Sequence, residues 1–236
     1  MSNPYFQFKQ FTVYHDLCAM KVGTDGVLLG AWADCTQAKT ALDIGTGSGL
    51  IALMLAQRSG APIHAIDIDE NACEQAKINF ENSPFSSLLI VEKAAFQHWE
   101  TSLRFDLIVS NPPYFSDSLK SPNAQRNFAR HNDSLFFADL IGKSLSLMNP
   151  GGKLAVILPF DGFGDFHTLA LENRLFLCRK TLVSSLPHKP VKRVLLEYSN
   201  QEADYKENIL LIEQSPKIYS EEYIALTKDF YLFPNI

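Results

Sequence analysis

The chain has 236 residues, of which 46% are hydrophobic and 20% are charged, and its formal net charge at pH 7 is −5. This apolar content excludes disorder for most of the chain and is sufficient for one sizeable core. The four cysteines form no CxxC pair, and we see neither a signal peptide nor an apolar run long enough to span a membrane. We therefore expect a cytoplasmic protein without a metal site or a membrane partner.

The first predicted elements are a short β-hairpin and a short helix, after which strands and helices alternate from residue 40. The hairpin covers residues 6–15, and the helix opens at Thr24-Asp25 before the apolar segment VLLGAWA. We expect strands at 40–44, 63–68, 88–91 and 105–110. We expect helices at 50–59, from Asp69 to about residue 82 and, after a long polar loop over 111–132, from Asp133 or Ser134 through 147.

The second half of the chain changes character after one more strand and helix. Pro150-Gly151-Gly152 is predicted to turn into a strand at 153–158, and a helix follows at about 163–173. Strands at 175–184, 192–198 and 208–213 have no helices between them, which predicts antiparallel pairing, and a last helix begins near Ser220. The alternation predicts an α/β fold with a mostly parallel sheet, an antiparallel end and helices on both faces.

The segment Gly45-Thr46-Gly47-Ser48-Gly49 closes the first strand of the sheet and opens a helix. Glycines let the backbone approach a ligand, and the helix N-terminus adds free N–H groups and partial positive charge. A tight turn without a ligand is the alternative. Asp67 weighs against it, because it ends the second strand 18 residues after Gly49, where a carboxylate can accept both ribose hydroxyls. We predict that the three glycines, Asp67 and the adjacent Ile68 bind a nucleoside-type cofactor.

The spacing GxGxG differs from the dinucleotide fingerprint GxGxxG, and Asp43 before the loop disfavours a phosphate and suits a cationic ligand. The whole motif, DIGTGSG, resembles the first motif of class I methyltransferases. That resemblance implies a doubly wound, Rossmann-like fold with a seven-stranded sheet. It also implies S-adenosylmethionine as cofactor, which carries an ammonium and a sulfonium. Asp43 matches the acidic position that holds the methionine end, often through water.

The same resemblance implies further cofactor contacts. The segment before the first sheet strand often folds over the methionine moiety in class I enzymes, which indicates Lys21 and Thr24, although Thr24 or Asp25 can also cap the helix. Many relatives carry an acidic residue for the adenine amino group after the third strand, where this chain has alanine. We expect a backbone contact at Ala95, with Phe96 packing near the adenine, in its place.

Asn111-Pro112-Pro113-Tyr114 follows the predicted strand at 105–110 and is the most specific motif in the chain. The prolines stiffen the loop, and the Asn111 side-chain oxygen and the Pro112 carbonyl can together accept both hydrogens of an amino group. The lone pair of the amino nitrogen can then point at a methyl donor. Tyr114 offers a flat aromatic face on which a planar substrate can stack. A proline-rich turn with a surface tyrosine is the alternative. The motif resembles (D/N/S)PP(Y/F/W) of amino-methyltransferases, which act on adenine N6, cytosine N4 or glutamine amides.

Several segments together resemble the bacterial tRNA1(Val) adenine-N6 methyltransferase family over essentially the whole chain. They are FQFKQFTVYHDLCAMKVGTDGVLLGAWA, DIGTGSGLIALMLAQR, NPPYF, RNFARH and YIALTKDFY. The resemblance implies one methyltransferase domain over residues 1–236, with a hairpin and helix lid at 1–39 and a Rossmann-like core at 40–236. It implies N6-methylation of an adenosine in the tRNA anticodon loop, at position 37, where an unstacked base can enter a pocket at low cost.

Basic residues cluster in two stretches that lack acidic residues, although the chain as a whole is acidic. One stretch runs from 173 to 196 and the other from 118 to 132. Such clusters indicate a localised phosphate footprint, with a solvated positive face as the alternative. We predict RNA contacts by Lys120, Arg126, Arg130, His131, Lys189, Lys192 and Arg193.

Two other classes of function stay open on the sequence alone. One keeps the chemistry and changes the substrate to a protein glutamine or a DNA adenine. A DNA enzyme would need a target-recognition segment, and we see no inserted domain. The other is a non-catalytic RNA-binding module, which has no need of both a glycine loop and an NPPY motif. We expect the enzyme to act on tRNA as a monomer.

Overall fold

The computed structural model describes residues 3–113 and 124–232, and for residues 124–135 it describes the backbone alone. The strands of the main sheet are β3 (Ala41–Ile44), β4 (Ile63–Asp67), β5 (Leu89–Lys93), β6 (Phe105–Ser110), β7 (Met148–Pro159), β8 (Phe176–Ser184), β9 (Arg193–Ser199) and β10 (Lys206–Leu211). The α-helices are α1 (Thr24–Trp32), α2 (Leu50–Ser59), α3 (Glu70–Glu81), α4 (Ala124–Leu147), α5 (Phe163–Glu172) and α6 (Glu221–Thr227). Short 3-10 helices lie at Ser86–Leu88, Phe96–His98 and Phe160–Gly162. Two antiparallel hairpins pair β1 (Tyr5–Gln7) with β2 (Thr12–Tyr14) and β11 (Glu213–Ser215) with β12 (Ile218–Tyr219).

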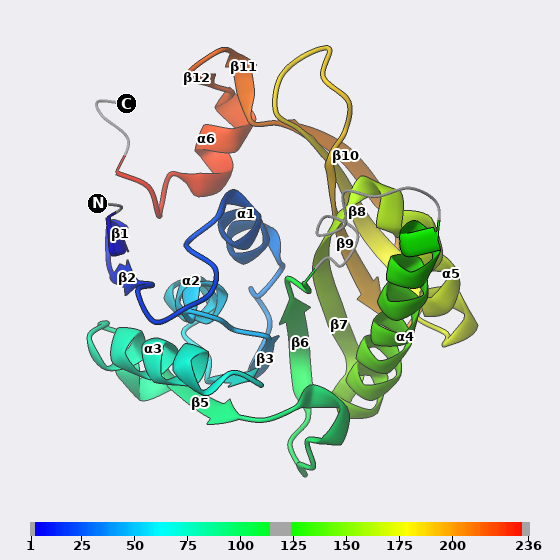
Figure 1. Cartoon of the computed structure of the whole chain (residues 1–236), viewed down its shortest axis with the longest axis horizontal. Helices are drawn as coiled ribbons and strands as arrows, with labels where there is room; N and C mark the ends of the chain where they lie inside the picture. Colours follow the sequence, from blue (N-terminus) through cyan, green and yellow to red (C-terminus); the bar gives the residue numbers. More distant parts are fainter. Residues whose placement is uncertain (1–2, 114–123, 233–236) are drawn as a thin grey trace.

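The main sheet has the strand order β10-β8-β9-β7-β6-β3-β4-β5 (Figure 1). Strand β9 runs antiparallel to both of its neighbours, β7 and β8, and the other neighbouring strands of this sheet are parallel. The predicted α/β fold with a mostly parallel sheet is confirmed. The seven-stranded count is wrong, because β10 adds an eighth strand. It pairs parallel with β8, so the expectation of antiparallel pairing holds for β9 and fails for β10.

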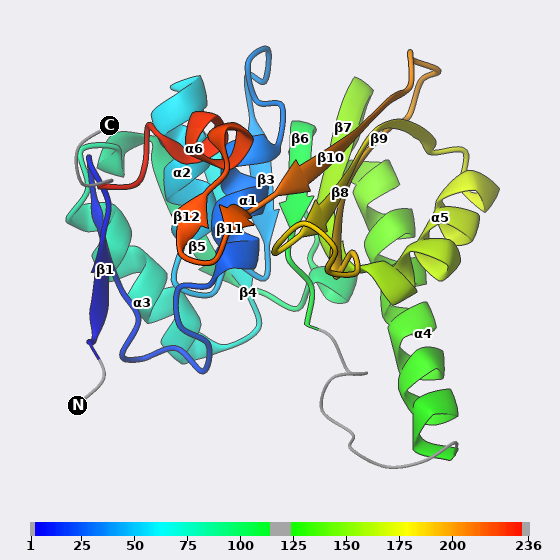
Figure 2. The same cartoon turned by 90° about the horizontal axis from the view of Figure 1, so that it is seen from above.

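Helices cover both faces of the sheet, with α1, α2 and α3 on one face and α4 and α5 on the other (Figures 1 and 2). The strands alternate their side chains between the two layers, as a sheet buried on both faces requires. In β6, Leu107 and Val109 join the core under α1 and α2, whereas Ile108 joins the core under α4. The central strands are therefore apolar on both faces, which explains why their sequences read as nearly continuous apolar runs.

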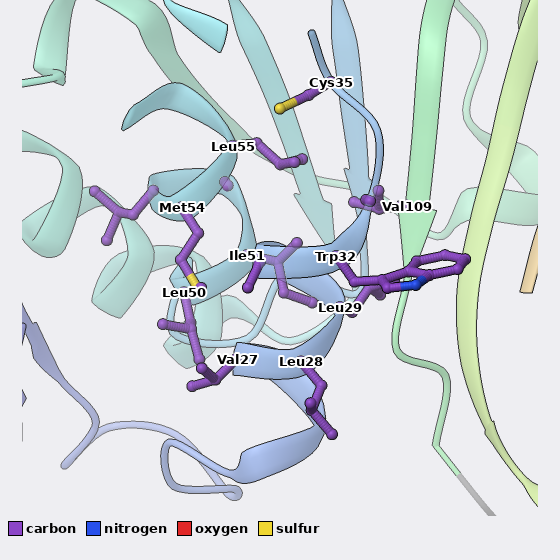
Figure 3. Packing of buried hydrophobic residues seen from close by; sticks show 14 of the residues in the cluster. Val27, Leu28, Leu29, Trp32, Cys35, Leu50, Ile51, Met54, Leu55 and Val109 are labelled. Carbon is purple, nitrogen blue, oxygen red and sulfur yellow. The ribbon is translucent and has the colours of Figure 1, made fainter. Parts of the chain in front are cut away.

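Helix α1 is a packed part of the core. Its residues Gly26–Trp32 are all buried, and Figure 3 shows its side chains meeting those of α2, with Val27 close to Leu50. A Cβ built on Gly30 would lie 2.7 Å from the sulfur of Met54, so the glycine permits the close approach of the two helices. The predicted N-terminal hairpin and helix are confirmed, while the function of residues 1–39 as a lid stays a prediction.

A buried carboxylate joins α1 to the sheet. The Glu197 side chain of β9 is 3% exposed and forms ion pairs with Lys153 of β7 at 3.3 Å and Arg179 of β8 at 2.9 Å. Lys153 also pairs with Asp34, just after α1, at 2.8 Å. The guanidinium of Arg179 lies 3.7 Å from the ring centroid of Trp32 in α1. Because both cations reach across the strands to the end of α1, this ion cluster fixes the helix against β7–β9–β8.

Two predicted boundaries are wrong. Helix α4 begins at Ala124 instead of at Asp133 or Ser134, so the loop after β6 is shorter than the predicted 111–132. The segment between Ala124 and Asp133 is polar but contains neither glycine nor proline, and nothing in it stops a helix. Strand β7 begins at Met148, and Pro150-Gly151-Gly152 forms an irregularity within it, where the pairing with β6 shifts register between Phe105 and Leu107.

Candidate active site

Three strands of the main sheet, β3, β4 and β6, end next to one another and form what we call the carboxyl edge. The glycine loop, residues 45–49, follows β3 there. The backbone N–H groups of Gly45 and Thr46 both donate to the carbonyl of Ile66, at 2.9 and 3.0 Å, which anchors the loop to β4. This anchoring turns the chain toward α2, whose first residue follows the loop directly.

The three glycines of the loop have two different structural roles. All three have positive φ, at +70°, +55° and +80° for Gly45, Gly47 and Gly49. A Cβ built on Gly45 or Gly47 would meet no described atom within 4 Å, so both face open space. A Cβ on Gly49 would lie 2.4 Å from the Phe80 ring of α3. Gly45 and Gly47 therefore leave room for a ligand, whereas Gly49 lets α3 pack against the loop.

Asp67 lies at the end of β4 with its carboxylate turned toward the glycine loop. One oxygen accepts a hydrogen bond from the N–H of Gly47 at 2.8 Å, and the other accepts from the N–H of Asp69 at 2.9 Å. The residue is half-buried, and each carboxylate oxygen has further lone pairs. Asp69 is the cap of α3, as predicted, since its side chain accepts from the N–H of Asn71. The neighbouring Ile68 is 69% exposed, which makes an apolar surface available beside Asp67.

Asp43 lies beneath the loop and is fully buried. One carboxylate oxygen accepts from the hydroxyl of Thr46 at 2.7 Å and from the N–H of Ala52 at 3.2 Å, while the other is a buried atom without a hydrogen bond to any described residue. Burial raises the pKa of the Asp43 carboxyl to about 7. The bonds observed show Asp43 bracing the loop against α2, and its predicted contact with a ligand stays a prediction.

The Asn-Pro-Pro segment follows β6 at the same edge. Ile44 of β3 pairs in register with Ser110 of β6, so Asn111 and Gly45 leave neighbouring parallel strands at the same level. The hydroxyl of Ser110, which is buried, donates to the carbonyl of Ile44 at 3.0 Å and ties the two strand ends together. Asn111 is half-buried, Pro112 is buried and Pro113 is exposed. Tyr114 lies outside the described residues.

Sequence reasoning did not identify Ser110 or Thr46 as parts of this site. Ser110 joins the end of β6 to the end of β3, and Thr46 joins the loop to Asp43. Neither residue touches a ligand through these bonds, yet each holds a predicted ligand-binding segment in place. The sequence signal that could have identified these two residues is a hydroxyl side chain at the end of an apolar strand or inside a glycine-rich turn.

The remaining predicted cofactor residues flank the carboxyl edge. The N–H of Ala94 donates to the carbonyl of Asp67 at 2.8 Å, which brings Ala95 and the buried Phe96 close to the end of β4. Lys21 and Thr24 are exposed. The alternative that Thr24 or Asp25 caps α1 is wrong, because the cap residue is Gly23, which has no side chain to make the capping bond. Asp25 instead forms an ion pair with Arg193 at 2.8 Å.

The comparisons with known proteins place this chain in a family. The family model described as "Methyltransferase small domain" matches residues 21–159. A tRNA1(Val) (adenine(37)-N6)-methyltransferase of Phocaeicola vulgatus is 53% identical over 98% of this chain and 99% of its own length. A protein of the same name from Parabacteroides distasonis is 51% identical with the same coverage. The chain belongs to the tRNA1(Val) (adenine(37)-N6)-methyltransferase family.

Solved structures agree on the fold of this family member. A predicted O-methyltransferase from Agrobacterium tumefaciens superposes with a TM-score of 0.70 at 19% identity and covers 87% of this chain and 96% of its own. The N-methyltransferase NodS from Bradyrhizobium japonicum, in complex with S-adenosyl-L-homocysteine, gives a TM-score of 0.54 at 18% identity, with 74% and 84% coverage. The chain therefore has the class I, Rossmann-like methyltransferase fold.

As a methyltransferase of this family, the chain uses S-adenosylmethionine. The carboxyl edge fits that cofactor. Gly45 and Gly47 leave open space at the loop, and the carboxylate of Asp67 keeps lone pairs that can accept ribose hydroxyls. A buried acid at Asp43 disfavours a phosphate and favours a positively charged ligand.

The predicted RNA-binding residues fall into three groups. Lys120 lies outside the described residues, and so do the side chains of Arg126, Arg130 and His131, whose backbone belongs to α4. Lys189 and Lys192 are exposed in the loop between β8 and β9. Arg193 is half-buried and paired with Asp25, so its charge already has a partner in the fold.

Neither a membrane span nor a metal cluster occurs in the described part of the chain. None of the helices in these ranges combines the length and apolar character needed to cross a bilayer. The same ranges contain no group of three His, Cys, Asp or Glu side chains placed to hold a metal ion.

Proposed function

We propose that this chain methylates N6 of an adenosine in tRNA, at position 37 of tRNA1(Val), with S-adenosylmethionine as the methyl donor. The names of relatives that are 53% and 51% identical over almost the whole chain support this activity. The observation that carries the proposal is the register between Ile44 and Ser110, because it brings the Asn-Pro-Pro segment beside the glycine loop.

The residues after β6 would orient the substrate nitrogen. When bound, the cofactor supplies an electrophilic methyl group on its sulfonium. The side-chain oxygen of Asn111 and the carbonyl of Pro112 would accept the two hydrogens of the adenine amino group. The N6 lone pair held in this way would accept the methyl group that the cofactor supplies, with its sulfur as the leaving group, and one N6 proton would be lost to solvent. Positioning of this kind lowers the barrier without a metal or a strong general base.

The surrounding residues would hold the two reactants. Asp67 is proposed to accept the ribose hydroxyls, with Ile68 and Phe96 as apolar neighbours of the adenine. Tyr114 is proposed to stack on the target base. Lys120, Arg126, Arg130, His131, Lys189 and Lys192 remain proposed RNA contacts. We further propose that the enzyme works as a monomer in the cytoplasm, which agrees with its four free cysteines.

One experiment tests the substrate and the modified atom together. The protein is incubated with methyl-labelled S-adenosylmethionine in parallel reactions that contain bulk tRNA, DNA or a protein extract, and the RNA is digested to nucleosides. We expect the label in N6-methyladenosine. Label confined to added protein would support the glutamine alternative, label in DNA alone would support a DNA enzyme, and either result would overturn the proposal. A tRNA1(Val) transcript with adenosine 37 replaced by guanosine is the matched control, and it should take up no label.

A further inference from the structure

We propose that Phe160, Lys189 and Lys192 form a surface, here called the RNA shelf, that holds the nucleotides next to the target adenosine. Phe160 would stack on a base, and the two lysines would bind phosphates. This inference rests on the proposed function, because it names the part of the protein that contacts the same RNA.

Strand register places the RNA shelf near the Asn-Pro-Pro segment. Ser110 of β6 pairs with Val156 of β7, and β7 continues to Pro159. Phe160 thus lies four residues beyond the level of Ser110, roughly 13 Å along the strand direction and one strand spacing to the side. The N–H of Phe160 donates to the carbonyl of Lys192 at 3.1 Å, which joins the two parts of the shelf.

The exposure of Phe160 is unexplained by the packing of the core. Leu158, two residues earlier, is fully buried, and Phe166 of α5 is also fully buried. Phe160 is 40% exposed. An aromatic ring at the rim of a site that acts on single-stranded RNA offers a stacking face that accepts any base.

The cations of the acid-free stretch fall into two classes. Arg179, Lys180 and Arg193 form ion pairs with Glu197, Glu207 and Asp25, at 2.9, 3.0 and 2.8 Å. Lys189 and Lys192 are exposed, and the described ranges contain no ion pair for either of them. These residues look alike in the sequence, but in the described ranges Lys189 and Lys192 are the cations of this stretch that have no ion pair and lie near the end of β7, where their charge is available for a phosphate. Arg174 is also exposed without an ion pair there, but it lies at the opposite end of β8.

The loop that carries the lysines is fixed before RNA arrives. The hydroxyl of Ser184 lies 2.9 Å from the carbonyl of Leu186 and 3.0 Å from that of Lys189. The N–H of Lys189 donates to the carbonyl of Leu186 at 3.2 Å, and that of Lys192 donates to the carbonyl of Val183 at 3.1 Å. A loop held in this way loses little conformational entropy when it binds, so it is suited to position a substrate.

The first test replaces the ring. In Phe160→Ala, we expect kcat/KM for a tRNA1(Val) transcript to fall about tenfold, mainly through KM, because one base–aromatic stack is removed. The Kd for S-adenosyl-L-homocysteine should not change. Phe160→Trp should restore activity and Phe160→Leu should not, which separates stacking from apolar packing. Leu171→Ala, at a side chain that is 49% exposed on α5, is the matched control and should leave kcat/KM unchanged.

The second test removes the charges. For Lys189→Ala and Lys192→Ala, we expect weaker binding of the transcript and a salt dependence that is shallower by about 0.7 for each phosphate that the variant no longer binds. Arg174→Ala is the matched control, because Arg174 is also exposed but precedes β8 at the opposite edge of the sheet. Unchanged RNA kinetics in Phe160→Ala and an unchanged salt slope in the lysine variants would overturn the shelf. A wild-type enzyme that does not methylate tRNA would instead overturn the proposed function.

Discussion

Two buried carboxylates, Asp43 beneath the glycine loop and Glu197 in the middle of β9, are held in opposite ways. Glu197 has ion pairs with Lys153 and Arg179, so the β7–β9–β8 region neutralises its own buried charge. Asp43 is braced by a hydroxyl and one backbone N–H, and its second oxygen has no hydrogen bond within the described ranges. The fold itself therefore supplies the countercharge of Glu197. The carboxyl group of Asp43, in contrast, is one that a cationic ligand would stabilise.

The comparison separates stability from function within one sheet. Residues of the ion cluster should govern unfolding and leave methyl transfer unchanged. Residues that face outward at the carboxyl edge should govern methyl transfer and leave unfolding nearly unchanged. A substitution that moves both quantities together would show that this separation is wrong for that residue.

The largest expected effect is on turnover, in Asn111→Ala. We expect kcat to fall by about 100- to 1,000-fold, because one of the two acceptors that orient the amino group is removed. The Kd for S-adenosyl-L-homocysteine, measured by calorimetry, should stay within a few-fold of wild type. Asn208→Ala, at an exposed position on β10, is the matched control and should keep full activity. Near-normal turnover in Asn111→Ala would contradict the proposed mechanism.

Two glycines of the loop, Gly49 and Gly45, should respond differently to replacement by alanine. Gly49→Ala should lower the free energy of unfolding by about 3 kcal/mol, since the new methyl group meets Phe80 and φ is positive. Gly45→Ala meets no described atom within 4 Å and should cost only about 1 kcal/mol of stability from its positive φ. Its cofactor affinity should nevertheless fall clearly, because the methyl group enters the ligand space. Urea unfolding and calorimetry measure the two effects, and equal loss of stability in both variants would contradict the assignment.

Substitutions in the ion cluster should lower stability without changing activity. In Glu197→Gln, we expect the free energy of unfolding to fall by about 2 kcal/mol, because two partly buried cations lose their shared countercharge. Activity per folded molecule should not change. Glu207→Gln is the matched control, because Glu207 pairs with Lys180 at an exposed position and its loss should cost at most about 1 kcal/mol. A fall in kcat without a fall in stability would be evidence against a purely structural cluster.

The sequence predicts well those parts of the fold that short-range physical signals determine. Helix α2 and strand β6 match their predicted bounds, because a glycine-rich turn begins α2 and strand β6 is a nearly continuous apolar run. The cap at Asp69 is also confirmed. The start of α4 and the pairing of β10 could not be predicted in the same way. The first residues of α4 are mostly polar and show no apolar periodicity. The strand with which β10 pairs depends on contacts between residues that are distant in the chain.

The same limit applies to the site. The spacing of the glycines and Asp67 predicts a cofactor site, and the structure joins Gly47 to Asp67. The spacing alone cannot show that Gly49 packs against Phe80 instead of facing open space. The pairing of Arg193 with Asp25, 168 residues away, leaves no local trace in the sequence. Counting basic residues therefore overstated the charge available to RNA. Only the fold shows which cations already have partners, and it also joins Phe160 to Lys192, which is exposed and has no ion pair within the described ranges.

A pH dependence of stability belongs to Asp43. Its pKa is raised to about 7 in the fold, chiefly by burial, whereas an unfolded aspartate titrates near pH 4. Between these values the folded chain binds the proton more tightly than the unfolded chain does. The contribution of this group to stability is therefore full below about pH 4, and it is lost as the pH rises toward 7.

Asp43→Asn removes this titration while keeping an oxygen that can accept from Thr46 and Ala52. We expect the free energy of unfolding of wild type, minus that of the variant, to fall steadily between about pH 4 and pH 7 and to level off above that range. Urea titrations at a series of pH values measure this difference, in which the other titrating groups cancel. Parallel curves for wild type and Asp43→Asn would mean that Asp43 is ionised throughout, and that some other group in the fold compensates its charge as Lys153 and Arg179 do for Glu197.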